Sequence, residues 1–159
     1  MAVNKYQPHV LVLPEDDANR QLANGFVLSE SVPTRQIQVL EEAGGWLEVL
    51  HCFEADHVDA MDRYPERFMI LLIDFDGNAS RLDDAKTFVP QRLTNRVFVL
   101  GALNEPEDIR RALGPYETVG LAMAQDCHEG TDSTWGHALL RHNASELERL
   151  RNSVRPILF

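Results

Sequence analysis

Residues 70–78 have the sequence Ile-Leu-Leu-Ile-Asp-Phe-Asp-Gly-Asn. A continuous apolar run before a Gly-Asn turn is typical of a strand buried on both faces, which places Asp74 and Asp76 at its carboxyl end. Open α/β sheets bind their ligands at that end of their strands. In an extended segment, residues i and i+2 share a face about 6–7 Å apart, so we expect both carboxylates to serve one hydrated Mg²⁺ or a pair of ions.

A second acidic group follows another short apolar segment, residues 9–14, which ends in Glu15, Asp16 and Asp17. If the two segments are neighbouring parallel strands, Glu15 converges with the two carboxylates of residues 74–76 at one edge of the sheet. Carboxylates placed in this way repel one another unless a proton or a cation is bound. A divalent cation is the simpler solution at neutral pH, so the sequence predicts a site for Mg²⁺ or Mn²⁺.

The composition sets the broad class of the protein. The chain has 159 residues, of which 44% are hydrophobic and 25% charged. These values predict one soluble globular domain, residues 1–159, that is large enough to bury its own core. No apolar stretch approaches the roughly 18–20 residues of a membrane span, and the first residues lack the apolar core of a secretory signal. We therefore expect a cytoplasmic protein with no membrane partner.

The net charge of −10 argues against simple binding of nucleic acid, because non-specific affinity comes from Lys and Arg displacing counterions from phosphates. The charge is uneven, however, since arginines concentrate in residues 141–155 and acidic residues concentrate at the predicted strand ends. A bound metal ion would offset part of that negative charge locally. Nucleic acid thus stays a candidate partner, and we also expect either a protein partner or a second copy of the chain.

Strand and helix patterns alternate along the first two thirds of the chain. The patterns predict strands in residues 9–14, 35–40, 70–73 and 96–101. They predict helices in residues 18–28, 46–64, 81–93 with an interruption at Pro90, and 105–113. Such alternation predicts an α/β fold with a mostly parallel sheet of four to five strands and helices on both faces. Residues 118–126 and 144–152 also have a helical pattern, so residues 114–159 are expected to form a helical carboxyl-terminal extension.

The order of these features resembles the TOPRIM domains of topoisomerases, primases and OLD-type nucleases. The resemblance rests on Glu15 after the first strand, the Gly-Gly turn 44–45 after the second, and Asp74 and Asp76 after the third, and it covers about residues 9–113. It implies a TOPRIM-like, Rossmannoid α/β fold. It also implies that the two aspartates hold Mg²⁺, and that Glu15 is the general acid or base or a further metal ligand.

Small TOPRIM-like and OLD-type members carry another acidic residue where the helix after the fourth strand begins, and Glu105 and Glu107 stand there. The resemblance implies phosphodiester chemistry on nucleic acid by a metal-dependent nuclease or phosphotransferase, within a defence or DNA-processing system. Metal-assisted hydrolysis needs only ions, an activated water and a group to bind the leaving oxygen, so one domain is sufficient. The alternative is a non-catalytic subunit that binds a partner protein.

The same acidic residues also fit a response-regulator receiver domain, a signalling module. In that interpretation Asp16 and Asp17 bind Mg²⁺ and Asp74 accepts a phosphoryl group. Against it, residues 101–102 are Gly-Ala where a receiver carries Thr or Ser followed by Ala, and no lysine occurs in residues 87–159 to act as the receiver's conserved lysine.

Residues 126–137 contain a second group of polar side chains, including Cys127, His128 and His137. Their spacing matches no standard zinc motif. We expect a loop near the acidic site in which Thr and Ser hydroxyls hydrogen-bond the backbone. His137 is a candidate proton carrier there because imidazole titrates near neutral pH, and a structurally hydrogen-bonded histidine is the alternative.

Overall fold

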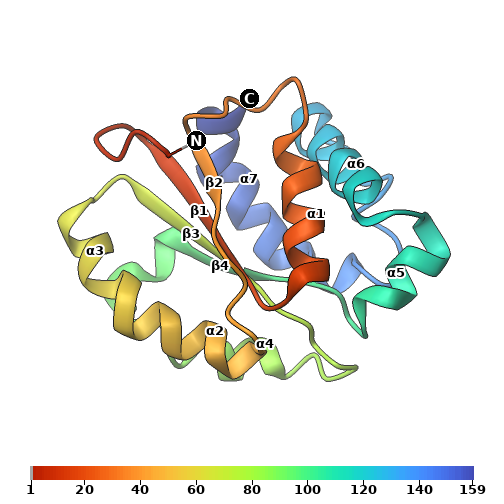
Figure 1. The fold of residues 1–159 in the computed structure, drawn as a ribbon, viewed down its shortest axis with the longest axis horizontal. Helices are drawn as coiled ribbons and strands as arrows, with labels where there is room; N and C mark the ends of the chain where they lie inside the picture. Colours follow the sequence, from red (N-terminus) through yellow and green to blue (C-terminus); the bar gives the residue numbers. More distant parts are fainter. Residues whose placement is uncertain (1) are drawn as a thin grey trace.

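The protein, described over residues 2–159 by a computed structural model, is built on a parallel sheet of order β2-β1-β3-β4 (Figure 1). The strands are β1 (His9–Pro14), β2 (Ile37–Val39), β3 (Arg67–Leu72) and β4 (Val97–Leu100). Pro14 at the end of β1 pairs with Leu72, which in turn pairs with Leu100 of β4. Three strands therefore end at nearly the same level, and the α/β fold expected from the alternating patterns is confirmed.

Helices cover both faces of the sheet (Figure 1). They are α1 (Asp17–Val27), α2 (Trp46–Cys52), α3 (Val58–Arg63), α4 (Arg81–Lys86), α5 (Pro106–Leu113), α6 (Tyr116–Glu129) and α7 (Ala144–Leu158). A π-helical segment, η1 (Phe53–His57), joins α2 to α3, and two 3₁₀ segments, η2 (Gln91–Arg96) and η3 (Arg141–Asn143), precede β4 and α7. Helix α1 packs on α6 beside α7, and α2 and α4 lie on the opposite face (Figure 1).

The helix predicted over residues 81–93, with an interruption at Pro90, ends several residues before that proline in the structure. Helix α4 ends at Lys86, and η2 begins only after Pro90. Proline has no N–H to continue a helix and restricts the residue before it, which accounts for the break. Within residues 2–159, no helix combines the length and the apolar character needed to cross a lipid bilayer.

The apolar strands have two buried faces. Val10 and Val12 of β1 belong to the core under α1, α6 and α7, whereas Leu11 and Leu13 belong to the core under α2 and α4. Successive strand residues point to opposite faces, so a sheet covered on both sides requires apolar residues at every position. This explains the continuous apolar runs in the sequence.

Two glycines allow the backbones of α1 and α6 to touch. A Cβ atom on Gly25 would lie 2.2 Å from the carbonyl oxygen of Glu117, and one on Gly120 would lie 2.0 Å from that of Leu22. Glycine within a helix costs conformational entropy, and here it permits a close helix crossing. The contact holds the helix that follows the acidic β1 end firmly against the rest of the domain.

The chain after β4 is held by a side chain. Gly101 has φ +157°, and a Cβ there would lie 1.5 Å from the carbonyl oxygen of Ile73. Buried Asn143 accepts a hydrogen bond from the Gly101 N–H at 3.1 Å and donates one to its carbonyl at 3.0 Å. One amide thus satisfies both backbone groups of Gly101, as a further strand would have done.

Candidate active site

Glu15 and Asp74 meet where β1 and β3 end. Strand β1 lies between β2 and β3, and open α/β sheets bind ligands in the crevice where the strand order reverses. The N–H of Glu15 donates to the Leu72 carbonyl at 2.9 Å, which extends the strand pairing by one residue. The N–H of Asp74 then donates to Oε2 of Glu15 at 2.6 Å. The structure therefore brings these two residues together, as the sequence predicted.

A buried amide joins two carboxylates at this point. Asp16 caps α1 by accepting the N–H of Asn19 at 2.9 Å. Nδ2 of Asn19 donates to Oδ1 of Asp16 and to Oδ1 of Asp74, both at 3.0 Å. Asn19 is fully buried, so its amide holds the two acidic side chains at a defined separation. Asn19 carries no sequence signal of this role, although it stands three residues after the capping Asp16.

The protonation of the site is shifted toward neutral pH. Burial, together with the nearby charges of Glu15 and Asp16, raises the pKa of Asp74 to about 7, against the opposing hydrogen bond from Asn19. Burial also raises the pKa of Glu15, although the hydrogen bond from the Asp74 amide acts in the other direction. At pH 7 the cluster therefore holds a proton for part of the time, and a bound cation would take its place.

Arg81 and Trp46 complete one side of the site, and neither residue carries a sequence signal that marks it as functional. A terminal nitrogen of Arg81 donates to the carbonyl oxygen of Asp74 at 2.7 Å, and the guanidinium carbon lies 4.4 Å from the centre of the Trp46 ring. Stacking on an aromatic face suits arginine in particular. The pair fixes the backbone on which Asp74 is carried.

The Gly-Gly turn lies beside the same site. The N–H of Gly44 donates to the carbonyl oxygen of Glu15 at 2.8 Å, and Gly44 has φ +105°, a conformation that favours glycine. The turn leads directly into α2, which begins with Trp46. The feature that supported the TOPRIM resemblance therefore contacts the predicted acidic residue.

Asp76 and Asp17 are placed differently from the other acidic residues. Asp76 has φ +52°, its side chain is 71% exposed, and its nearest basic partner is a terminal nitrogen of Arg81 at 4.0 Å. It makes no hydrogen bond to Glu15 or Asp74 within the described structure. Asp17 is exposed and accepts a hydrogen bond from Gln21 of its own helix at 2.7 Å. Asp16, and not Asp76, is thus the third carboxylate of the observed cluster.

The donor chemistry of the cluster suits a hard cation. The carboxylates of Glu15, Asp16 and Asp74 supply the oxygen ligands that Mg²⁺ prefers. Among residues 2–159, no three His, Cys, Asp or Glu side chains are close enough to coordinate one metal ion directly. Mg²⁺ usually keeps several waters and binds through one or two carboxylates, so the arrangement fits a largely hydrated Mg²⁺ better than a fully liganded ion.

Glu105 and Glu107 lie where α5 begins. The N–H groups of Phe75 and Gly77 donate to the carbonyls of residues 102 and 103 at 2.9 and 2.6 Å, so the turn after β3 runs alongside the chain that leads to Glu105. Both glutamates are exposed, and Glu105 makes no capping hydrogen bond to α5. Their negative charge lies near this edge of the sheet without contacting the Asp74 cluster.

Tyr116 is a further residue near the site that the sequence did not mark. It is buried at the start of α6. Burial raises its pKa, and the charges of Glu107, Asp16 and Asp74 raise it further. These carboxylates are therefore within electrostatic reach of the Tyr116 ring, whose hydroxyl stays protonated at neutral pH.

The loop after α6 is organised by the buried Asp126. Its carboxylate accepts the Thr131 hydroxyl at 2.7 Å and the N–H groups of Ser133, Thr134 and Trp135 at 3.2, 2.7 and 3.1 Å. Although burial alone would raise the pKa of Asp126, these four hydrogen bonds lower it. The Thr131 hydroxyl thus bonds a carboxylate, not the backbone as expected.

His137 has a structural contact in this loop. Its Nδ1 accepts the N–H of Leu139 at 3.1 Å, and the Leu139 carbonyl accepts the N–H of Leu103 at 3.0 Å. His142, in contrast, packs edge-on against Phe75 with 4.9 Å between ring centres. Burial lowers the pKa of His142, so its imidazole beside the turn after β3 is neutral at pH 7.

Comparisons of this chain with protein-family models, with curated protein sequences and with solved structures returned no match. The fold and the site therefore define it structurally, as a parallel α/β domain with a carboxylate cluster at the ends of its two central strands.

Proposed function

We propose that this domain binds Mg²⁺ at the carboxylate cluster of Glu15, Asp16 and Asp74 and uses it in phosphodiester chemistry on nucleic acid. The observation that carries the proposal is the contact between Glu15 and Asp74 at the point where the strand order reverses. Burial raises the pKa of both residues. Cells maintain millimolar Mg²⁺, and a cation at this place would relieve the repulsion that otherwise requires a proton.

The residues of the chain have separate tasks in this proposal. Asp74 and Asp16 hold the ion, and Asn19 keeps their carboxylates oriented. Glu15, with one oxygen engaged by the Asp74 amide, accepts or returns a proton through the other. Bound Mg²⁺ supplies polarisation of the phosphoryl group and activation of a water. Asp76 and Arg81 at the rim are placed to contact the incoming phosphate backbone or its ions.

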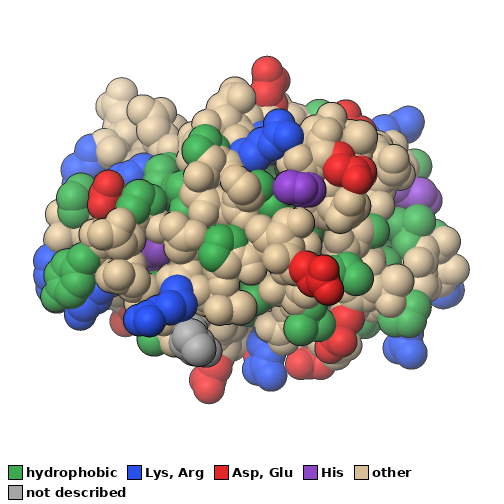
Figure 2. Space-filling model, turned by 90° about the horizontal axis from the view of Figure 1, so that it is seen from above, with side chains coloured by type: hydrophobic (Ala, Val, Ile, Leu, Met, Phe, Trp, Pro, Cys, Tyr) green, Lys and Arg blue, Asp and Glu red, His purple; other side chains and the backbone are tan. Residues whose placement is uncertain are grey.

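Binding of nucleic acid depends on more than this chain's surface charge. The chain has a net charge of −10, and the face shown in Figure 2, at the end of the domain where the chain termini lie, carries basic and acidic side chains in separate small groups. Arg151 and Arg155 of α7 are also engaged internally, with Asp132 at 3.0 Å and with the His128 carbonyl at 2.7 Å. We therefore propose that a partner protein or a second copy of the chain supplies much of the affinity for phosphates.

Calorimetric titration with MgCl₂ and MnCl₂ tests the metal site. We expect saturable binding by the wild type and at least about tenfold weaker binding by Asp74→Asn and by Glu15→Gln. The first substitution removes a charged oxygen ligand of the ion, and the second removes the charge of the carboxylate beside that ligand. Asp83→Asn, in an exposed position on α4, is the matched control and should bind as the wild type does. Asp76→Asn tests whether the exposed carboxylate joins the site when the ion is bound.

Cleavage of plasmid DNA and of single-stranded RNA is measured on the same preparations. Metal-dependent cleavage that is lost in Asp74→Asn and kept in Asp83→Asn would support the nuclease function. Metal binding without cleavage would favour the non-catalytic, partner-binding alternative. No binding at millimolar metal would refute the proposed site altogether.

A receiver-like phosphoacceptor is the second candidate function. One observation favours it, since Asp16 from the β1–α1 loop meets Asp74 at the end of β3 through Asn19. The sheet order 2-1-3-4 also matches the first four strands of the flavodoxin-like arrangement. Gly101 weighs against it, because a side chain at this position would collide with Ile73. Incubation with acetyl phosphate and Mg²⁺, followed by intact-mass measurement of the wild type and of Asp74→Asn, would show an added phosphoryl group that is present in the wild type and absent from the variant only if this alternative holds.

A further inference from the structure

A concavity of about 400 Å³ lies at the amino-terminal end of the sheet, opposite the end that carries the carboxylate cluster. It is lined by residues 5–6, which precede β1, and by residues 63–66, which join α3 to β3. These two segments lie side by side at the end of the domain that carries α3 (Figure 1). Small-molecule sites usually measure about 300–1,000 Å³, so the space is large enough for a nucleotide.

Two tyrosines supply the aromatic part of this concavity. The rings of Tyr6 and Tyr64 meet edge to face, with 6.1 Å between their centres. Tyr6 is 74% exposed, so most of its ring is open to solvent. An exposed aromatic ring is the kind of surface on which a nucleobase stacks.

Tyr64 is held by a chain of contacts that begins in the core. His9 is fully buried, and its Nδ1 donates to the carbonyl oxygen of Gln7 at 2.7 Å. Its Nε2 therefore accepts the Nε–H of Arg67, at 2.9 Å. The guanidinium carbon of Arg67 lies 4.9 Å from the centre of the Tyr64 ring. The ring is thus oriented before any ligand arrives, which lowers the entropic cost of binding.

Basic side chains accompany the two rings. Nζ of Lys5 lies 5.6 Å from the centre of the Tyr6 ring and 5.2 Å from that of Tyr64, and Arg63 is exposed in the same lining. In the described part of the chain, neither Lys5 nor Arg63 forms an ion pair. Glu66 is the acidic residue of the lining, so positive charge is in excess here although the chain has a net charge of −10.

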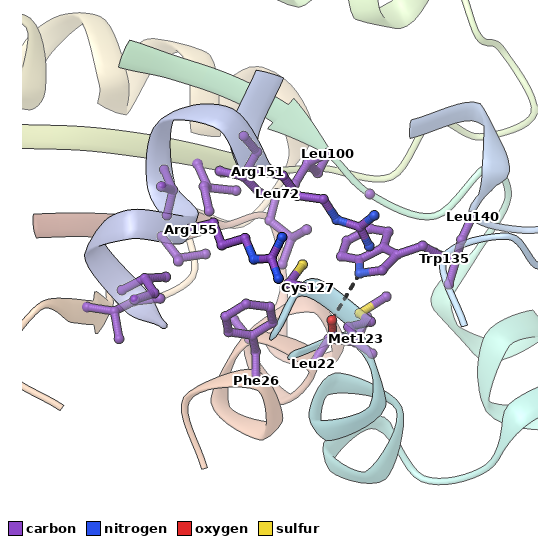
Figure 3. Close-up of a pocket in the computed structure, with 18 of the residues that line it drawn as sticks. Leu22, Phe26, Leu72, Leu100, Met123, Cys127, Trp135, Leu140, Arg151 and Arg155 are labelled. Atoms are coloured by element: carbon purple, nitrogen blue, oxygen red, sulfur yellow. Dashed lines mark hydrogen bonds between the residues drawn. The ribbon is translucent and has the colours of Figure 1, made fainter. Parts of the chain in front are cut away.

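The arginines of α7 are used differently. Arg151 and Arg155 lie beside an apolar cavity of about 70 Å³ that α7 forms with α1, α6 and the sheet (Figure 3). Their guanidinium groups are turned to Asp132 and to the carbonyls of residues 131 and 128. These arginines therefore stabilise the loop after α6, and the cavity offers no charged group to a ligand.

We propose that the concavity at residues 5–6 and 63–66 binds a nucleotide unit of single-stranded nucleic acid. A base stacks on the exposed ring of Tyr6, and the phosphates accept charge-assisted hydrogen bonds from Lys5 and Arg63. Strands rise about 3.3 Å per residue, so the length of β1 places this contact roughly 20 Å from the carboxylate cluster. The inference rests on the function proposed above and names its substrate class, because the bases of a duplex are not free to stack.

Fluorescence anisotropy of a labelled oligo(dT) of about 12 nucleotides provides the measurement. The titration is done in EDTA and at low salt, so that neither metal binding nor cleavage contributes. We expect saturable binding of the single strand and at least about tenfold weaker binding of the duplex that it forms with oligo(dA).

Substitutions at Tyr6 test the stacking. Tyr6→Leu removes the ring and should weaken binding of the single strand at least about fivefold. Tyr6→Phe keeps the ring and is the matched control, which should bind within about twofold of the wild type. Circular dichroism melts show whether both variants fold as the wild type does.

Substitutions of the basic residues test the phosphate contacts. For single strands, each contact contributes about 0.7 to the slope of log K against log [NaCl]. Lys5→Met and Arg63→Met should therefore each reduce this slope by about that amount. Arg141→Met, at an exposed arginine outside the concavity, is the control and should leave the slope unchanged.

Three results would overturn the inference. They are no saturable binding of oligo(dT), equal affinity for single strand and duplex, and equal affinity of Tyr6→Leu and Tyr6→Phe in variants that melt as the wild type does. Each of these is read without metal and so is independent of the carboxylate cluster. Failure of Mg²⁺ binding or of cleavage, with binding of oligo(dT) intact, would instead refute the proposed function and leave the binding site in place.

Discussion

Asp74 links the protonation of the site to the stability of the domain. Burial and the neighbouring acidic groups raise the pKa of its carboxyl from 3.8 to about 7 in the folded protein. Between these two values the folded state binds more protons than the unfolded state. The contribution of Asp74 to the free energy of unfolding is therefore fully present below about pH 4 and is lost progressively as the pH rises to 7. Above pH 7 it no longer changes with pH.

Asp74→Asn should remove this dependence. The amide has no charge to desolvate, and its oxygen can still accept the hydrogen bond from Asn19. We expect the variant to be more stable than the wild type at pH 8, by on the order of 2–4 kcal/mol, and similar to it at pH 4.5. Urea unfolding at the two pH values, in the absence of divalent ions, measures the difference.

The exposed Asp83→Asn substitution serves as the control for this experiment. It removes the same charge from the chain outside the cluster and should change stability by less than about 0.5 kcal/mol at either pH. A wild-type protein whose advantage over Asp74→Asn grows from pH 4.5 to pH 8 would contradict the assignment.

Asp126 is expected to be a stability residue and not a ligand of the site. Its buried carboxylate accepts four hydrogen bonds from the loop that follows α6. Asp126→Ala should lower the free energy of unfolding by about 2–4 kcal/mol, because the buried Trp135 N–H and three partly buried donors lose their acceptor. Asp132→Ala, at an exposed position in the same loop, should cost about 1 kcal/mol or less. Comparable losses in both variants, measured by urea unfolding, would argue against this role.

The crossing of α1 and α6 depends on glycine. Alanine in place of glycine within a helix normally stabilises it by roughly 0.5–1 kcal/mol. Gly120→Ala should instead destabilise the domain by about 1–3 kcal/mol, because its Cβ would meet the Leu22 carbonyl oxygen at 2.0 Å. Thr118→Ala, on the exposed side of α6, is the control and should be neutral or slightly stabilising. The melting temperature should therefore fall in Gly120→Ala and stay the same or rise slightly in Thr118→Ala.

Element boundaries could be predicted where a local signal marked them. Strand β4 was expected over 96–101 and spans Val97–Leu100, and α5 was expected over 105–113 and spans Pro106–Leu113. The helical pattern of 46–64 did not reveal the π-helical segment Phe53–His57. A π-helical segment is defined by its i→i+5 hydrogen bonds, and the spacing of a few apolar residues does not distinguish these from the hydrogen bonds of an α-helix.

The whole domain should be stabilised by the ion that its site binds. A ligand that binds only the folded state adds RT ln(1 + [L]/Kd) to the free energy of unfolding, which is about 1.4 kcal/mol for 10 mM Mg²⁺ and a Kd of about 1 mM. We expect this increase at pH 8 in the wild type and its loss in Asp74→Asn. NaCl of equal ionic strength is the control. An equal effect of the two salts would mean that Mg²⁺ only screens the net charge of −10.

The candidate site could be predicted from sequence in part. Glu15 and Asp74 follow two apolar strands, and parallel neighbours end at one edge, so their meeting followed from topology. Asn19 and Arg81 carried no pattern that separates a buried bridge from an ordinary helix residue. The sequence pattern predicted the same role as metal ligand for Asp76 as for Asp74. Asp76 has a positive φ in the turn, so its backbone does not continue the extended conformation of a strand.

Local patterns in the chain were sufficient for the α/β class, the order of its elements and the acidic strand ends, because hydrophobic periodicity and turn residues act over a few positions. Side-chain partners depend on contacts between distant segments. The hydrogen bond from Asn19 to Asp74 joins residues 55 positions apart, and the hydrogen bond between Asn143 and Gly101 joins residues 42 positions apart. The raised pKa of Asp74, the cavity beside α7 and the choice of Asp16 over Asp76 arise from burial, which only the assembled fold creates.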